Sequence, residues 1–243
     1  MRAIVASFRF LTRIPVPGPE TRVEDLAWAV GWFPLVGGVV GLGTSAVFFF
    51  ALRLWPATVA AVLAIAFGLM LTGGFHEDGL TDATDGLGGG WTRERILEIM
   101  KDSRIGAYGS MALWASLTLR WACLVALDRK ALWLLPLAMV WGRWSVCLIL
   151  RLLPSISQGL AKEVHKDLKW GAFALATALL VLANALAWYF GLRSIGRIGL
   201  AAIGTTLVWV IYLRHRLGGH SGDTLGAGNQ FAEAAALLAM LAS

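Results

Sequence analysis

Long apolar runs separated by short charged segments make up most of this chain. Runs close to the roughly 17 to 25 residues that cross a bilayer as a helix occupy about 31–54, 56–75, 109–127, 131–150, 171–191 and 197–213, and a shorter run covers 229–243. We therefore expect seven transmembrane helices, with six or eight as alternatives. Because the charged segments are too short for a separate soluble domain, the pattern predicts one all-α, polytopic membrane domain over residues 1–243.

Residues 2–14 have a different pattern, with apolar and basic positions on opposite faces of a helix. At 100° per residue the apolar side chains fall within about 120° of arc; they are Ile4, Phe8, Leu11 and Ile14, with Arg2, Arg9 and Arg13 opposite. Such a helix is expected to lie on the inner membrane surface and to end at the prolines that follow Ile14. Arg13 would anchor lipid headgroups there or bind substrate.

The second apolar run continues directly into an acidic, glycine-rich stretch. A single helix from Ala57 to Gly86 would contain thirty residues and be about 45 Å long, whereas the hydrocarbon core of a bilayer is about 30 Å thick. We therefore expect this helix to project from the membrane at its inner end and to carry the acidic side chains there.

The composition supports a membrane protein. Hydrophobic residues make up 58% of the 243 positions, charged residues only 15%, and twelve residues are Trp, which is far from an average soluble domain. Cys123 and Cys147 lie inside apolar runs, where we expect small packing side chains and no disulfide. The N-terminus lacks the apolar core and cleavage site of a signal peptide, so we expect it to be retained.

Basic residues are distributed unevenly between the two sides that these helices would define. If the N-terminus is cytoplasmic, fourteen Lys and Arg lie on the inner side and five on the outer side, while Arg120 and Arg143 fall within spans. Inner loops of membrane proteins are enriched in Lys and Arg, so the count predicts a cytoplasmic N-terminus. The net charge of +6 then reflects orientation, and nucleic-acid binding is not needed to explain it.

The stretch at 73–90 concentrates one His and four carboxylates. On a helix, Asp78, Asp82 and Asp85 would share one narrow stripe, called the aspartate stripe below. Three carboxylates on one face repel one another unless cations lie among them, and oxygen ligands at this spacing suit a hard divalent ion such as Mg²⁺. The alternative is an acidic helix end solvated by water. Gly86, beside the stripe, would let a bulky substrate approach the backbone.

Cations follow shortly after the aspartate stripe. Lys101 and Arg104 flank a carboxylate and the hydroxyl of Ser103, and near a metal they would form a clamp for phosphate oxygens. The alternative is the ordinary basic flank of a span on the inner side. Lys162, in a later loop on the same predicted side, could reach the same inner face.

Ionisable residues also occur inside the predicted spans. Arg143 stands about two turns from the inner end of its helix, so it could extend toward the inner surface, and it is a candidate for substrate binding. Arg120 lies nearer the middle of the membrane, where we expect it to pair with a carboxylate from another helix. His76 and Glu77 point away from the aspartate stripe and are secondary candidates.

A last polar cluster leads into the final apolar run. Asp223 or Thr224 is expected to cap the closing helix, in which Asn229, Gln230 and Glu233 would share a face. A carboxylate more than one turn inside a span indicates function. The site candidates from this cluster are Gly222, Asp223, Asn229 and Glu233.

Five blocks of the sequence, in this order and spacing, resemble the cobalamin synthase family, the adenosylcobinamide-GDP ribazoletransferases of the bacterial inner membrane. The blocks are 10–17 (FLTRIPVP), 73–87 (GGFHEDGLTDATDGL), 100–109 (MKDSRIGAYG), 159–162 (GLAK) and 218–227 (GGHSGDTLGA). The resemblance runs over most of the chain. Glu77 departs from it, because the family usually has a hydrophobic residue there.

The resemblance implies a Mg²⁺-dependent transfer of adenosylcobinamide phosphate from adenosylcobinamide-GDP to alpha-ribazole or its 5′-phosphate, with release of GMP. Asp78, Asp82 and Asp85 would then hold Mg²⁺ on the diphosphate, and Asp223 would complete the site or act as base for the ribazole hydroxyl. Lys101, Arg104 and Arg143 would stabilise the phosphoryl charge and the leaving GMP. A homo-oligomer, or association with other enzymes of cobalamin assembly, is compatible with this family.

Two other classes of protein remain alternatives. A cation-coupled transporter would line its pathway with intramembrane acids at a broken helix, but its binding groups would lie near the midplane and not on one face. A structural membrane subunit would leave the aspartates without a purpose.

Overall fold

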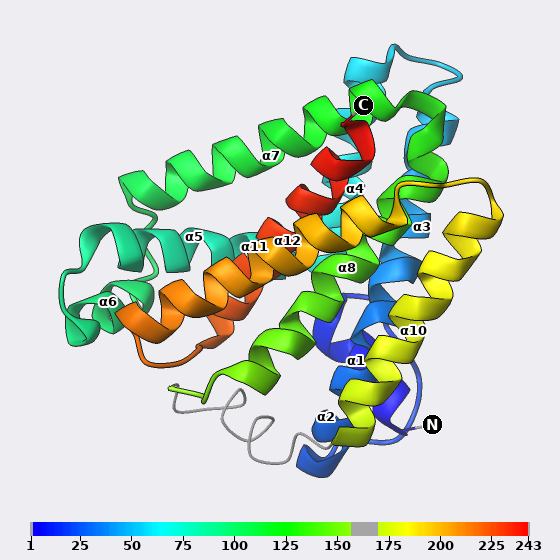
Figure 1. The fold of residues 1–243 in the computed structure, drawn as a ribbon. Coiled ribbons are helices and arrows are strands. Elements are labelled where there is room, and N and C mark those ends of the chain that lie inside the picture. Colours follow the sequence, from blue (N-terminus) through cyan, green and yellow to red (C-terminus); the bar gives the residue numbers. More distant parts are fainter. Residues whose placement is uncertain (1, 157–169, 243) are drawn as a thin grey trace.

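The computed structural model describes residues 2–156 and 170–242, and their regular structure is helical (Figure 1). The elements are α1 (Arg2–Leu11), α2 (Val23–Ala29), η1 (Val30–Trp32), α3 (Phe33–Ala51), α4 (Ala57–Thr72), α5 (Phe75–Gly89), α6 (Arg93–Met100), α7 (Ala107–Leu127), η2 (Asp128–Lys130), α8 (Ala131–Leu152), α10 (Trp170–Tyr189), α11 (Ile195–Arg216) and α12 (Gly222–Leu241). The predicted all-α class is confirmed.

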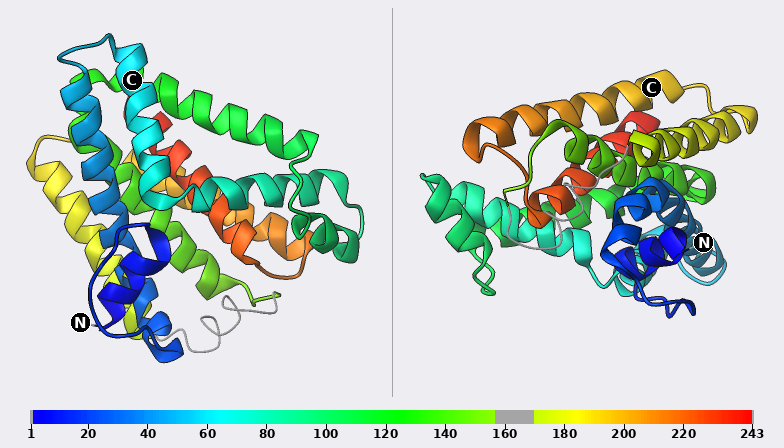
Figure 2. Two further views of the ribbon diagram at one scale, coloured as in Figure 1. Left: turned by 180° about the vertical axis from the view of Figure 1, so that it is seen from behind. Right: turned by 90° about the horizontal axis from the view of Figure 1, so that it is seen from below.

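Helix α8 forms the centre of the bundle and is buried along most of its length. The helices that pack on it are α3, α12, α10 and α11. The closest of these approaches depends on Gly37 and Gly41 of α3, because a Cβ at either position would lie 2.5 Å from the backbone of α8. Helices α5 and α6 extend to one side of this bundle, away from α10 (Figures 1 and 2).

The connecting segments gather at two opposite ends of the bundle. The α3–α4 loop, η2 and the α10–α11 loop lie toward the upper right of Figure 1, and the ends of α5, α8 and α11 lie toward the lower left. Successive long helices therefore run back and forth between two faces, which is the arrangement expected of a polytopic membrane protein.

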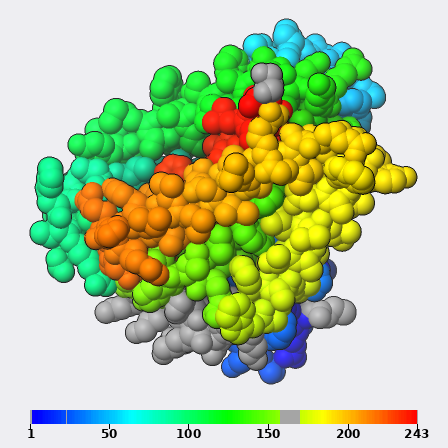
Figure 3. Space-filling view, in the orientation of Figure 1, coloured from blue at the N-terminus to red at the C-terminus, as the bar shows by residue number. Residues whose placement is uncertain are grey.

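Four helical segments are long and apolar enough to cross a membrane, namely Glu24–Ala51, Ala107–Leu152, Trp170–Tyr189 and Ile195–Arg216, and a fifth joins them if the bent pair α4 and α5 counts as one span. Each of the seven apolar runs in the sequence lies on a helix, and the count of seven spans stays a prediction. Helices α10 and α11 form an exposed face (Figure 3) with large apolar side chains such as Leu182, Leu200 and Val208. Such a surface suits contact with lipid.

The prediction of one continuous helix from Ala57 to Gly86 is wrong. Helix α4 ends at Thr72, and α5 leaves it at an angle of 89°. Gly73 and Gly74 form the bend, both with φ of +68°, a left-handed conformation that side-chain-bearing residues adopt only at a cost. The acidic stretch is therefore a separate helix, which branches from the end of α4 in the left view of Figure 2, and it does not continue α4 in a straight line.

The predicted N-terminal helix is present as α1, which packs against α2 and α3. It ends at Leu11, before the prolines. Arg9 donates hydrogen bonds to the carbonyl oxygens of Val16, Gly18 and Pro19 at 3.1, 3.0 and 2.7 Å, so its guanidinium folds the proline-rich segment back along α1.

Candidate functional site

Helices α5 and α12 cross so closely that the aspartate stripe lies beside the start of α12. The crossing point is Gly79 against Gly226, where a Cβ on Gly79 would lie 3.0 Å from the carbonyl oxygen of Asp223. Asp82 is near enough to Asp78 and Asp223 for their charges to interact. We call Asp78, Asp82 and Asp223 the acidic cluster; Asp78 is exposed and the other two are half-buried.

Asp223 is left free for chemistry by the way α12 begins. The predicted cap at Asp223 or Thr224 is wrong, because Ser221 is the N-cap, accepting from the backbone N–H of Thr224 at 3.3 Å while the Thr224 hydroxyl accepts from Ser221 N–H. In the described ranges 2–156 and 170–242, the Asp223 carboxylate accepts only a long bond of 3.4 Å, from the Ser221 hydroxyl. Burial raises the pKa of Asp223 above its usual value, and the charge of Asp78 raises it further.

Asp85, the third member of the aspartate stripe, is buried and joins α5 to the start of α7. Its two oxygens accept from the backbone N–H groups of Gly106 at 2.7 Å and Gly109 at 2.8 Å. A Cβ on either glycine would lie 2.3 Å from this carboxylate, so the spacing of glycines after Ile105 is what admits it. These bonds satisfy free N–H groups of the helix terminus; a metal-ligand role for Asp85 stays a prediction.

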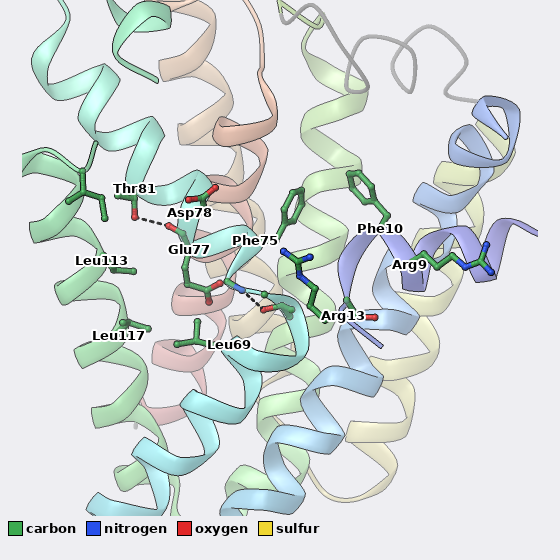
Figure 4. Close-up of a pocket in the computed structure, with 15 residues that line it drawn as sticks. Arg9, Phe10, Arg13, Leu69, Phe75, Glu77, Asp78, Thr81, Leu113 and Leu117 are labelled. Carbon is green, nitrogen blue, oxygen red and sulfur yellow. Dashed lines mark hydrogen bonds between the residues drawn. The ribbon is translucent and has the colours of Figure 1, made fainter. Parts of the chain in front are cut away.

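A cavity of about 630 Å³ opens between α1, the α4–α5 bend, α5 and α7. Arg13 and Asp78 both line it, with Glu77 and Thr81 on the same side of α5 (Figure 4). Arg13 is held at the bend, where its backbone N–H donates to the carbonyl oxygen of Leu71 at 2.7 Å. The structure thus brings Arg13 to the same cavity as the exposed member of the acidic cluster. We call this space the polar cavity.

The predicted cation clamp is on the surface between α6 and α7. Lys101, Ser103 and Arg104 are all exposed. Arg104 pairs with Asp102 at 2.6 Å, and its hydrogen bonds lower the pKa of Asp102 to about 2. The structure therefore does not bring the Arg104 guanidinium to the aspartates. Lys162 lies outside the described residues.

A buried network of charges joins α5, α7, α8 and α12. The Arg120 guanidinium lies 3.0 Å from Glu77 and 3.3 Å from Glu233, and Arg143 lies 2.8 Å from the second oxygen of Glu233. Gln230 accepts from Arg120 and donates to Glu77 at 3.1 Å. The prediction that Arg120 pairs with a carboxylate from another helix is confirmed, whereas Arg143 does not extend toward the inner surface.

The remaining candidates occupy different surroundings. A Cβ on Gly86 would lie 2.6 Å from the Met100 side chain, so this glycine lets α6 pack on α5. Asn229 is fully buried beside Gly142 of α8. Gly222 is exposed at the start of α12 and has open space around its α-carbon. Of these three, only Gly222 adjoins the acidic cluster, because it precedes Asp223.

Glu77 is the residue whose importance sequence reasoning missed. It lines the polar cavity and anchors α5 to Arg120, although its helical angle excludes it from the aspartate stripe. Arg120 was the sequence signal for a buried carboxylate, because an Arg inside a span requires a buried anion as its partner. The bend after Thr72 hid the partner, since a straight α4–α5 helix would not carry Glu77 into the bundle.

The acidic cluster is not a preformed metal cage. Within residues 2–156 and 170–242, no three His, Cys, Asp or Glu side chains are grouped so that they could hold a metal ion. What the structure provides is three neighbouring carboxylates, of which Asp78 lines a cavity that also contains Arg13. Such a set is suited to an ion that a substrate helps to bind.

Comparisons with known proteins give the relatives of this chain. The family model for cobalamin-5-phosphate synthase matches residues 3–241. An adenosylcobinamide-GDP ribazoletransferase from Leptothrix cholodnii is 40% identical, covering 99% of this chain and 95% of the relative. Relatives of the same name from Shewanella baltica and Vibrio parahaemolyticus are 36% and 35% identical, over 92% and 100% of this chain and 87% and 92% of their own.

No solved structure matches the chain. The residues matched by the family model include the acidic stretch, the bend and the start of α12. The chain therefore belongs to the cobalamin-5-phosphate synthase family.

Proposed function

We propose that this protein transfers adenosylcobinamide phosphate from adenosylcobinamide-GDP to alpha-ribazole or its 5′-phosphate, releasing GMP. The observation that carries the proposal is the family match over residues 3–241 to relatives named for this activity. In the reaction the ribazole hydroxyl forms a bond to the phosphorus that bears the cobinamide, and the bond from that phosphorus to the bridging oxygen of GDP breaks. The hydroxyl proton must leave, and GMP departs with the bridging oxygen.

Mg²⁺ is the metal that fits the ligands present. It is typically held by one or two carboxylates together with substrate phosphates and water, so Asp78 and Asp82, whose charges interact, would serve as its protein ligands. When bound, the ion would neutralise charge on the diphosphate. An all-oxygen set near an open cavity supports this choice over zinc, which prefers Cys and His.

The chain's own residues supply the remaining roles. Asp223 has a raised pKa, and in the described part of the chain its carboxylate accepts one long hydrogen bond, from Ser221; both features suit a base that accepts the ribazole proton. Arg13 lines the polar cavity with Asp78 and would bind diphosphate oxygens. Lys101 and Arg104 lie on an exposed segment just before α7, where Arg104 pairs with Asp102, so a role for them at the leaving GMP stays a prediction.

The test is GMP release by the purified protein in detergent or liposomes. Removing Mg²⁺ with a chelator, or replacing Asp82 with Asn, is expected to lower kcat by about 100-fold or more, a loss typical of removing one group that stabilises transition-state charge. Asp128→Asn, an exposed acid at the opposite end of α7, is the matched control and should leave the rate unchanged. Full activity in Asp82→Asn would refute the metal assignment.

One observation favours a cation-coupled transporter as second candidate. The 89° bend beside intramembrane charges resembles the broken helices of transporters. The family match argues for the enzyme. Ion uptake into proteoliposomes without GMP release would favour the transporter, and GMP release in detergent, where no gradient exists, would exclude transport as the primary activity.

The proposed location is the bacterial inner membrane, with the N-terminus and the acidic cluster facing the cytoplasm. The excess of Lys and Arg on that side, fourteen against five, supports this orientation.

A further inference from the structure

A second cavity, of about 280 Å³, lies against a different face of α5 from the polar cavity. Its walls come from α1, α2, α3, α5, α8 and the start of α12, and they are mainly apolar. The residues that matter here are Phe10, Phe33, Phe75, His76 and Gly222. We call this space the aromatic cavity.

Aromatic rings form the partition between the two cavities. Phe10 and Phe75 line both of them, with ring centroids 5.4 Å apart in an edge-to-face arrangement. Phe10 also stacks on Phe33 at 5.8 Å, and Phe75 lies 5.4 Å from the His76 ring. Flat aromatic ligands bind well among such rings. A ligand that extended past Phe10 and Phe75 would reach from one cavity into the other.

His76 gives this cavity a polar group without a partner. Its side chain is only 2% exposed, and its Nδ1 atom makes no hydrogen bond within the described part of the chain. A buried polar atom without a partner costs free energy, and an aromatic ring nitrogen entering the cavity would remove that cost. An aliphatic ligand would leave the imidazole unsatisfied.

The exposed edge of the aromatic cavity at Gly222, called its mouth below, adjoins the acidic cluster. Gly222 is exposed and lines the cavity, and the next residue is Asp223, the proposed base. A nucleoside whose base occupied the cavity would therefore have its sugar beside Gly222 and a sugar hydroxyl within reach of Asp223.

We propose that the aromatic cavity binds the bicyclic aromatic base of ribazole, with the His76 imidazole hydrogen-bonded to the free ring nitrogen. This proposal rests on the proposed function. It divides the two substrates between the two cavities, with the nucleoside acceptor in the aromatic cavity and the diphosphate donor in the polar cavity, and the acidic cluster between them.

Two variants test the assignment by separate routes. His76→Phe keeps a flat ring but removes the hydrogen bond, and should raise the KM for ribazole about tenfold, the value of one hydrogen bond of about 1.4 kcal/mol. Gly222→Leu places a side chain in the mouth and should raise the same KM by more. Both variants should leave the KM for adenosylcobinamide-GDP within about twofold of the parent value. Gly204→Leu, at another glycine with open surroundings, is the control.

Direct binding of ribazole, measured by calorimetry without the donor substrate, separates this proposal from the proposed function. A parent protein that binds ribazole in a His76-dependent way but releases no GMP would keep the cavity assignment and overturn the proposed function. GMP release with an unchanged ribazole KM in both variants would overturn the cavity assignment. A rise in the KM for adenosylcobinamide-GDP alone would overturn it as well, by placing the donor there.

Discussion

Glu77 and Arg120 show how a single buried carboxylate can decide whether this fold is stable. Both side chains are less than one-tenth exposed, so removing one partner leaves an uncompensated charge. We expect Glu77→Gln to lower the free energy of unfolding by about 3–5 kcal/mol, measured by denaturant unfolding in detergent micelles. Glu98→Gln breaks the exposed pair with Arg95 and should cost less than about 1 kcal/mol.

If Glu77→Gln and Glu98→Gln lowered the free energy of unfolding by equally small amounts, the buried charge network would not be what stabilises the fold. The double variant Glu77→Met with Arg120→Met should recover much of the stability, because it removes both charges together.

The ionised Asp223 carboxylate, which the proposed reaction needs as a base, is expected to destabilise the folded protein. Its pKa is raised above 3.8, so the native state binds the proton more tightly than the unfolded chain does. Stability due to this group is therefore highest at low pH and falls as the pH rises through the raised pKa. Asp223→Asn should be more stable than the parent at pH 7, should lose that advantage at pH 4, and should release GMP poorly.

Unfolding measured at both pH values checks this expectation, with Asp128→Asn as the control. The same stability difference at pH 7 and pH 4 would show that Asp223 is not the group whose ionisation opposes folding.

For single residues, the sequence predicted which face of a helix a side chain lies on better than it predicted which residues of other helices that side chain contacts. The 100° geometry of a helix placed Asp78 and Asp82 on one face correctly, because α5 is regular. The same geometry could not show that Asp85 accepts two N–H groups of α7, since that depends on a contact between helices. Helix geometry also could not show that Arg143, a candidate for substrate binding, pairs with Glu233, which lies 90 residues away in the chain.

The element on which the site depends is the bend between α4 and α5. Gly73 and Gly74 have the same φ of +68°, but a Cβ on Gly73 would lie 2.4 Å from Arg13, whereas one on Gly74 would meet no atom within 4 Å. Gly74→Ala should cost only the conformational strain of about 1–2 kcal/mol. Gly73→Ala should cost more and should also raise the KM for adenosylcobinamide-GDP, because it displaces Arg13.

Unfolding and steady-state kinetics of the two variants make a matched pair. If both glycines tolerated Ala equally and with equal KM, Arg13 would have no role at the bend.

The apolar runs of the sequence predicted the long helices, but they did not predict the bend between α4 and α5. Seven runs fell on helices because hydrophobic length is a property of the chain alone. The GlyGly pair at 73–74 marks a break, yet a glycine pair is equally consistent with close helix packing, as Gly37 and Gly41 show. Only the structure shows that the chain turns at Gly73 and Gly74, where both residues have φ of +68°.

The molecule as a whole is expected to insert with its acidic cluster toward the cytoplasm. Cys123 and Cys147 are buried and free, so the parent protein should react poorly with a membrane-impermeant maleimide. Lys101→Cys and Arg129→Cys place exposed thiols at opposite ends of α7. In inside-out membrane vesicles we expect labelling at 101 only, and in spheroplasts at 129 only. The reverse pattern would invert the orientation.

Helix α7 is fastened to α5 at two points, through Asp85 near its start and through Arg120 two-thirds of the way along it. These two helices form a stiff frame on one side of the polar cavity, so the space cannot widen by their separation. The opposite wall is α1, which among the described residues is attached by packing and, just beyond its end, by the backbone hydrogen bond from Arg13 to Leu71. A corrinoid is a bulky ligand, and we expect α1 to move outward to make room for it. Hydrogen exchange should therefore be faster in the amides of α1 than in those of α5 and α7, and a crosslink that fixes α1 to α5 should exclude the large donor while still admitting the small nucleoside.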